Sequence, residues 1–341
     1  MAETQRWVNR PDGSNWGDFG KDDQLGRFNL IDPAARLRGA AQVREGLAFC
    51  LSLPLDYPGG NALLGHRDEP RYHYAPRGEG HNFNFDMGSI IPCACDIVSD
   101  EAVTLDMQYS THWDALGHIG CAFDADGDGH DEVVYYNGYR AGEHLVGPSD
   151  PNPVKGAHAL GISNMAETAV QTRGVLIDLH RIWGFERVHV GYDELMPLIE
   201  KLDVEITKGD ILCFYTGFAD RLLGMRKKPD AGVLAKTSPG LDGRCPKLLN
   251  WITDSGVAGL CADNFTVETY PARPSDAPLH PVMPLHQHCL FKLGIPLGEL
   301  WYLAKLADWL HAAGRSSFLL TAPPLRLARA VGSPLTPVAT V

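Results

Sequence analysis

The sequence lacks three features that would place it among membrane, nucleic-acid-binding or disulfide-rich proteins. No run approaches the roughly 20 apolar residues that a membrane span needs, and the N-terminus is polar without an apolar signal core. Lysine and arginine are scattered along a chain of net charge −12, so no basic patch for phosphates is evident. The eight cysteines are dispersed, and the tight pair Cys93 and Cys95 is one residue short of a CxxC motif. We therefore expect a soluble, cytoplasmic protein with reduced thiols and neither a membrane nor a nucleic-acid partner.

Signatures of several large enzyme classes are also missing. The chain has no G-x-S-x-G nucleophile motif, no phosphate-binding P-loop and no Rossmann glycine pattern. Catalysis by a Ser-His-Asp triad and nucleotide binding therefore have no support in the sequence.

The composition that is present is typical of a globular protein. With 341 residues, 44% of them hydrophobic and 21% charged, the chain can form one large core or two ordinary ones. We find no internal repeat, low-complexity tract or linker. The simplest division is one domain over residues 1–341, with an N-terminal extension over about residues 1–45.

Helical and strand patterns alternate along the chain. Residues 32–45 begin with an aspartate cap followed by proline and continue with helical spacing of apolar residues. Short apolar runs typical of strands and segments with helical spacing follow. The strands are expected within residues 47–58, 173–179, 209–217 and 257–264, and the further helices within 193–203 and 245–256. This alternation predicts an α/β fold. Residues 59–80, rich in Gly, His, Arg and Pro, are interpreted as a long loop that forms a lid or a binding wall.

The densest group of chemically active side chains lies in residues 108–120, which read QYSTHWDALGHIG. In an extended strand Gln108, His112, Asp114 and His118 share one face, whereas a helix would turn neighbours two apart away from each other. Histidine and aspartate are common metal ligands. A lone histidine is more often a hydrogen-bonded core residue and an aspartate a turn cap, but the density of this group favours a metal site on a strand that runs into a turn.

A second acidic segment, FDADGDGHDEVVYYNG, is similar to the start of a calcium loop. Asp124, Asp126 and Asp128 have the expected spacing, but position twelve is Tyr135 instead of a bidentate glutamate. We interpret the segment as an acidic hairpin turn beside the active site. The aromatic residues that follow it, Tyr136 among them, are expected to line the pocket.

Residues 108–120 resemble the signature H-x-G-T-H-x-D-x-P-x-H of the metal-dependent cyclase family, which includes bacterial kynurenine formamidases and isatin hydrolases. The matching residues are Thr111, His112, Asp114 and His118. The departures are Gln108, Ser110 and Leu116, where the family has His, Gly and Pro. Further segments resemble the longer branch of the family: NWGDFGKDDQLGRFNLID, YYNGY, RGVLIDL, KGDILCFYTGF, CADNFTVE and PPLRLARAVGSPLTPVA.

The resemblance implies the family's swivelling β/β/α fold and a hydrolase whose divalent cation activates water. His112 and Asp114 would bind the cation, and His118 would be the base or proton shuttle, or a ligand of a second metal. Gln108 is either a ligand or only an orienting neighbour. As a ligand it would make the set richer in oxygen and favour manganese over zinc.

The resemblance also extends the site. A late histidine and a glutamate would face the metal centre. The glutamate is Glu299, which is assigned to the catalytic group. The histidine is His286, which fits the spacing better than His288 and is assigned to the metal ligands. Thr111 is assigned to the catalytic group, and Trp113 joins Tyr136 as a predicted pocket residue.

Two further carboxylates and the function itself stay open. Asp263 and Glu268 follow a buried strand, where they either serve the site or act as caps and salt-bridge partners. The expected activity is hydrolysis of a small amide-type C–N bond, as in an aryl formamide or a cyclic amide. The alternatives are a lactone or ester hydrolase of the same fold, or a metal-dependent binding protein with weakened catalysis. We expect a small-molecule substrate and a homodimer or homotetramer.

Overall fold

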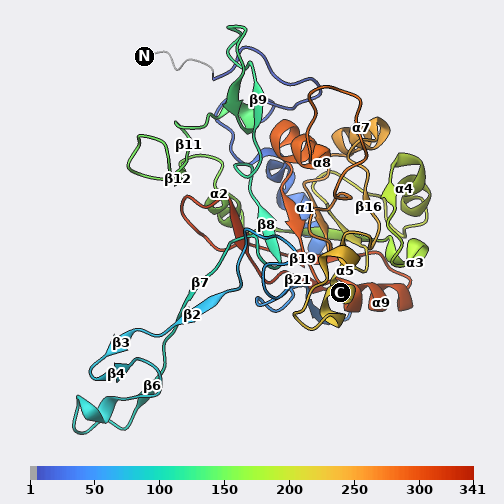
Figure 1. The fold of residues 1–341 in the computed structure, drawn as a ribbon. Helices are drawn as coiled ribbons and strands as arrows, with labels where there is room; N and C mark the ends of the chain where they lie inside the picture. Colours follow the sequence, from blue (N-terminus) through green and yellow to red (C-terminus); the bar gives the residue numbers. More distant parts are fainter. Residues whose placement is uncertain (1–5) are drawn as a thin grey trace.

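A nine-stranded sheet runs through the centre of the protein in a computed structural model, which describes residues 6–341 (Figure 1). The strand order is β1-β21-β19-β13-β15-β17-β18-β8-β20. Four central neighbours, β13, β15, β17 and β18, are parallel, and the strands on both sides of them pair antiparallel. The bounds are β1 Ala48–Cys50, β8 His112–Asp114, β13 Gln171–Asp178, β15 Ile211–Tyr215, β17 Gly259–Ala262, β18 Leu297–Glu299, β19 Ser317–Thr321, β20 Gly332–Pro334 and β21 Val338–Thr340.

The apolar runs of the sequence form the centre of this sheet, as predicted for β13, β15 and β17. Every residue of β15 and β17 is buried, because helices and loops cover both faces. Along β15 the side chains alternate: Leu212 and Phe214 join one core cluster, and Ile211 and Cys213 join the other. The sheet therefore separates two hydrophobic cores.

Helices cover the two faces. The helix α1 begins where predicted, because Asp32 accepts a hydrogen bond from the backbone N–H of Ala35. It ends at Ala40, earlier than expected, and packs against β13 and β19. The α-helices are α1 Pro33–Ala40, α2 Ile162–Glu167, α3 His180–Trp183, α4 Tyr192–Ile199, α5 Phe218–Gly224, α6 Ala231–Leu234, α7 Pro246–Ser255, α8 Pro284–His286 and α9 Ala304–Ala312. A π-helical segment, η4 Gln287–Leu293, continues α8, and short 3-10 turns are η1 Gly26–Leu30, η2 Met87–Ser89 and η3 Tyr136–Gly138.

The acidic segment forms a hairpin turn, as interpreted from the sequence. Asp124 accepts hydrogen bonds from the backbone N–H groups of Gly127 and Gly129, so its carboxylate stabilises the turn itself. The hairpin strands are β9 Cys121–Phe123 and β10 Glu132–Val134; small ladders nearby are β11 Leu145–Val146 with β12 Gly156–Ala157, and β14 His189–Val190 with β16 Gly240–Leu241.

The N-terminal segment packs into the body of the protein. Trp16 is fully buried, and its indole N–H donates to the carbonyl of Phe291 at 2.8 Å. Across residues 6–341 no helix is long and apolar enough to cross a bilayer.

Residues 59–80 differ from the expected loop, because most of them form the first half of a long β-arm over residues 60–108 that projects from the body (Figure 1). Three two-stranded ladders follow one another along it, and each has strands of only two or three residues. They are β2 Arg71–His73 with β7 Ala102–Thr104, β3 Pro76–Arg77 with β4 Gly80–His81, and β5 Phe85–Asp86 with β6 Ile97–Val98.

Candidate metal centre

One histidine and two carboxylates meet in the interior of the sheet. His112, Asp114 and Glu299 each offer a ligand atom, and these atoms lie within 4.8 Å of one another. The three residues are 1%, 0% and 3% exposed. A group with this much buried negative charge requires either protons or a cation.

Strand pairing brings the three residues together from distant parts of the sequence. The strand β8 lies between β18 and β20, and in its register His112 faces Glu299 of β18 directly. His112 and Asp114 are two residues apart on β8, so the pleat turns both side chains to the same face. The predicted strand that runs into a turn is present, because the backbone N–H of His118 closes a turn onto the carbonyl of Ala115.

The hydrogen bonds of the cluster leave its inward-facing atoms free for a cation. His112 Nδ1 lies 2.7 Å from the carbonyl oxygen of Ser110 and donates to it, so the lone pair is on Nε2. That Nε2 lies 3.3 Å from Glu299 Oε2 and 3.7 Å from Asp114 Oδ1. Within residues 6–341, Nε2 and both Asp114 oxygens are buried without a hydrogen-bond partner. Three converging, unsatisfied acceptor atoms fit a divalent metal ion.

The protonation of the cluster agrees with this fit. Burial acts to lower the pKa of His112, but Asp114 and Glu299 outweigh it and raise the pKa above its usual value. The two carboxylates therefore attract a positive charge to this point, which a bound cation supplies without a proton.

His118 lies between the cluster and the solvent. Its Nε2 is 3.7 Å from Asp114 Oδ1, and its Nδ1 is 3.5 Å from Gln108 Nε2. Burial is the main effect on this imidazole and lowers its pKa, so the ring is neutral at pH 7 and able to accept a proton. The amide of Gln108 contacts His118, an arrangement that suits the orienting role left open from the sequence.

A cavity of ≈ 560 Å³ opens on the outer side of His118. This volume is in the range of small-molecule sites. Its wall is mostly apolar with a few polar groups; the lining includes Gln108, His118, Tyr135, Leu145, Arg329 and Val331. A substrate in this cavity would reach the cluster past His118.

The comparisons with known proteins agree with the motif. A family model described as a cyclase matches residues 49–269, which is more than half of the chain. The chain belongs to the cyclase family. A solved structure described as a novel cyclase is 28% identical, with a TM-score of 0.75, over 96% of this chain and 97% of that one. No curated protein matches.

Two isatin hydrolases A have the same fold as this cyclase. The enzyme from Labrenzia aggregata, solved with benzyl benzoate, is 15% identical with a TM-score of 0.53, over 89% of this chain and 95% of that one. The enzyme from Ralstonia solanacearum is 16% identical with a TM-score of 0.52, over 90% and 94%. The predicted family and its swivelling β/β/α fold are thus confirmed.

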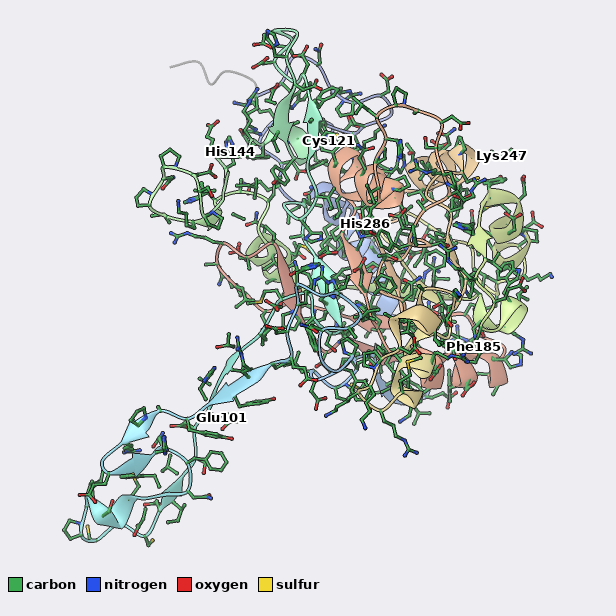
Figure 2. All side chains as sticks on the ribbon, in the orientation of Figure 1. Glu101, Cys121, His144, Phe185, Lys247 and His286 are labelled. Atoms are coloured by element: carbon green, nitrogen blue, oxygen red, sulfur yellow. The ribbon has the colours of Figure 1, made fainter. Side chains whose placement is uncertain are left out.

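Behind the cluster, two further buried side chains hold Glu299 in place. His286, labelled in Figure 2, has its Nε2 3.0 Å from Glu299 Oε1 and its Nδ1 2.8 Å from Glu268 Oε1. Burial alone would lower the pKa of His286, but hydrogen bonds to the two glutamates raise it to about 10. Burial likewise acts to raise the pKa of Glu299, yet its imidazole neighbours keep this pKa well below the usual range. Glu299 is therefore an anion at neutral pH.

Of the two late histidines, His286 is the one that contacts the cluster. His288 points elsewhere, with its Nε2 2.9 Å from the Leu249 carbonyl, and burial lowers its pKa to about 4. His286 lies outside the three-residue cluster but contacts its member Glu299, and both of its nitrogens face carboxylates. Its predicted role as a metal ligand remains a prediction.

Three residues that were predicted for the catalytic group or the pocket make their contacts elsewhere. The Thr111 hydroxyl donates to the Leu300 carbonyl and accepts from the Leu53 N–H, so both its bonds hold the start of β8 in place, and its predicted catalytic role remains a prediction. Trp113 lies on the opposite face of β8 in the hydrophobic core, because side chains alternate along a strand. Tyr136 is fully buried with its hydroxyl on Asp23; its neighbour Tyr135 lines the cavity.

Of the two carboxylates left open, one supports the site and one caps a helix. Glu268 accepts from the backbone N–H of His286 as well as from its ring. The choice between the two roles of Glu268 could not be made from the sequence, since its pairing with His286 depends on how α8 packs. Asp263 accepts from the N–H groups of Thr216 and Ala219 at the start of α5, which confirms the capping alternative.

Proposed function

We propose that this cyclase is a metal-dependent hydrolase that opens an amide-type C–N bond of a small molecule. The observation that carries the proposal is the set of three buried, unpaired acceptor atoms on His112 and Asp114, next to the anionic Glu299. His112, Asp114 and Glu299 would hold one divalent cation. When bound there, such an ion lowers the pKa of a water molecule and polarises a carbonyl group.

The residues around the cluster divide the remaining work. The neutral His118 would accept the proton of the attacking water and deliver it to the leaving nitrogen. The side-chain amide of Gln108 would orient the His118 ring, and His286 would keep Glu299 oriented and ionised. The apolar cavity wall would orient the substrate and limit the access of bulk water.

The donor set also supports a proposal about the metal. One imidazole nitrogen and two carboxylates form a set rich in hard oxygen atoms, which favours manganese, with zinc as the alternative. This argument holds whether or not Gln108 is itself a ligand. Turnover by chelator-treated protein reloaded with each ion over a pH series would decide it; greater activity with zinc throughout would contradict it.

The function can be tested with protein purified without chelator. We expect about one equivalent of divalent metal by elemental analysis and turnover of aryl formamides or cyclic amides in a panel that also contains lactones and esters. Turnover of only lactones or esters would support the alternative hydrolase. Bound metal with saturable ligand binding but no turnover would support a metal-dependent binding protein. Absence of metal would reject both the hydrolase and the metal-dependent binding protein. His288→Gln is a control, since His288 lies outside the cluster.

A further inference from the structure

The cavity beside His118 has one unpaired positive charge on its wall. Arg329 is the one lysine or arginine among the described residues that line this cavity. Across residues 6–341 its guanidinium has no hydrogen-bond or ion-pair partner. Most of the remaining wall is apolar, and the other basic side chain, His118, is neutral at pH 7. A single guanidinium on such a wall is placed to bind an anionic group of a ligand.

Backbone hydrogen bonds fix the position of Arg329 relative to the motif of residues 108–120. The carbonyl of Arg329 accepts from the N–H of Ala157 in β12 at 2.9 Å. The carbonyl of Val331 accepts from the N–H of Ala115, directly after β8, at 3.0 Å. Two residues of chain span at most about 7 Å, so Arg329 lies close enough to the motif for one small substrate to contact both.

The backbone of Arg329 has a left-handed conformation. Its φ is 65°, in a region that glycine adopts freely and most other residues avoid. Gly156 leaves room for this conformation, because a Cβ on Gly156 would lie 2.7 Å from the Cβ of Arg329. Residues held in such conformations are concentrated at binding and active sites, where the direction of a side chain matters.

The cavity wall also contains one carboxylate, which serves its own loop. Asp150 Oδ2 accepts from the backbone N–H of Gly147 at 2.6 Å and so closes the turn that follows β11. The ammonium group of Lys155 donates to the backbone carbonyl of Asp150, which adds a positive charge to the same loop. No ion pair joins the described residues Asp150 and Arg329. The charge of Arg329 therefore remains available for a ligand.

We propose that Arg329 selects substrates with a carboxylate group and holds this group so that the amide carbonyl faces the metal cluster. The inference rests on the proposed hydrolase function and names its substrate class. A guanidinium donates two parallel hydrogen bonds to a carboxylate, which fixes both the position and the orientation of the bound group. The apolar wall would contact the ring or chain that joins the carboxylate to the amide.

Two substrates that differ in charge provide the test. In 4-formamidobenzoate the ring bears a carboxylate, and in 4-formamidobenzamide it bears a neutral amide of similar shape; formate release reports the formamide bond of both. For the wild type we expect kcat/KM at least about 10-fold higher with the benzoate, mainly through a lower KM. In Arg329→Gln the ratio of the two values should fall to about one. Arg329→Lys should keep part of the preference, since lysine retains the charge but not the paired hydrogen bonds.

A charge reversal and a matched arginine control the result. Arg329→Glu should favour the 4-aminomethyl analogue of the formanilide, because its ammonium group can pair with the new carboxylate. Arg326→Gln removes an exposed arginine that pairs with Glu167 and lies outside the cavity lining, so this variant should keep the preference of the wild type. All variants should melt close to the wild type, because both arginines are exposed.

Ligand binding separates this inference from the hydrolase function. The compounds 4-aminobenzoate and 4-aminobenzamide lack the formamide bond, so their dissociation constants from calorimetry require no turnover. Binding of the benzoate at least about 10-fold tighter by the wild type, but not by Arg329→Gln, would support the role of Arg329 even in a protein that hydrolyses neither formamide. Formamide turnover without a preference for charge would support the hydrolase and reject the inference.

Two further results would overturn the proposal. A preference for the carboxylate that persists in Arg329→Gln would place this group on the metal ion or on another side chain. A preference that Arg326→Gln reduces as much as Arg329→Gln would reflect the general charge of the surface and not a contact in the cavity.

Discussion

At the residue scale, the unpaired acceptor atoms on β8 determine what this protein can bind. The Nε2 of His112 has no partner within the described chain, and its Nδ1 is held by Ser110 so that the ring cannot turn away. This hydrogen bond to the Ser110 carbonyl thus fixes the lone pair in the direction of Glu299. Small changes here should alter metal binding before they alter the fold.

The first prediction concerns His112. The substitution His112→Ala removes the only nitrogen donor of the three-residue cluster and leaves Asp114 and Glu299 facing each other. We expect metal content to fall below a tenth of an equivalent and activity to disappear with it. Elemental analysis of dialysed protein provides the measurement; full metal occupancy would reject the assignment of the site.

The second prediction separates His118 from the ligands. Because its ring lies beside Asp114 and also lines the cavity, we expect it to move a proton and not to hold the ion. His118→Gln should keep the metal but lower kcat by roughly 10²- to 10⁴-fold, the usual contribution of a general acid or base.

Metal content, melting temperature and turnover should be measured on one preparation of this variant. Loss of metal would make His118 a ligand, and turnover close to that of the wild type would make it a packing residue. His144→Gln, a partly exposed histidine outside the cluster, is the matched control.

The residues that were misassigned from the sequence share a physical cause. The two-residue period that placed His112 and Asp114 on one face also requires Trp113 to point the other way, into contact with Trp301. Its proximity in sequence to the metal ligands therefore says nothing about the cavity. The Glu268 contact to His286 depends on tertiary packing, which no local pattern encodes.

At the element scale, the carboxylate that follows β17 and caps the start of α5 has a charge that opposes folding. Asp263 is fully buried, and burial raises its pKa from the usual 3.8 to about 7 despite hydrogen bonds from Thr216 and Ala219. The folded state thus holds a proton that the unfolded chain releases near pH 4. The stability linked to this proton is complete below pH 4 and is lost as the pH rises to 7.

The third prediction follows from that sign. The contribution of Asp263 to the free energy of unfolding should decline by about 4 kcal/mol between pH 4 and pH 7, at about 1.4 kcal/mol for each pKa unit. Asp263→Asn cannot ionise and should flatten this slope, whatever its offset at a single pH. Urea titrations at several pH values provide the measurement, and an unchanged slope would contradict the assignment.

The strands that lie in the hydrophobic core could be predicted from the sequence, whereas the strands of the β-arm could not. The apolar runs of β13, β15 and β17 are buried on both faces, so hydrophobicity identifies them. The arm strands have only two or three residues and no buried face, so they lack a period to detect. Their apolar residues resemble those of a core, although none is buried within this chain.

At the scale of the whole molecule, the metal site joins strands that close one side of the sheet. The ligands on β8 and β18 lie opposite each other across a strand pair. A cation bound to both strands would stabilise only the folded state, because the unfolded chain does not bring these ligands together.

The fourth prediction is a dependence of thermal stability on metal. At a free metal concentration 100 times Kd, binding adds about 2.7 kcal/mol to the free energy of unfolding. Removal of metal should therefore lower the melting temperature by a few degrees, and addition of excess manganese should restore it. His112→Ala should melt at the same temperature with and without manganese; an equal response of both proteins would place the stabilising ion elsewhere.

Because β8 pairs with β18 and β20, which are synthesised later, the cluster can form only late in synthesis on the ribosome. The β8 ligands are made first, whereas Glu299 and the β20 partners near the C-terminus are made last. At about 5–20 residues per second, synthesis leaves β8 without both neighbours for on the order of ten seconds or more. Before β18 is made the nascent chain cannot assemble the cluster, so the proposed metal would have to be taken up by the folded chain from the surrounding pool. Which ion it would carry then depends on the folded cluster and on the ions available at that moment.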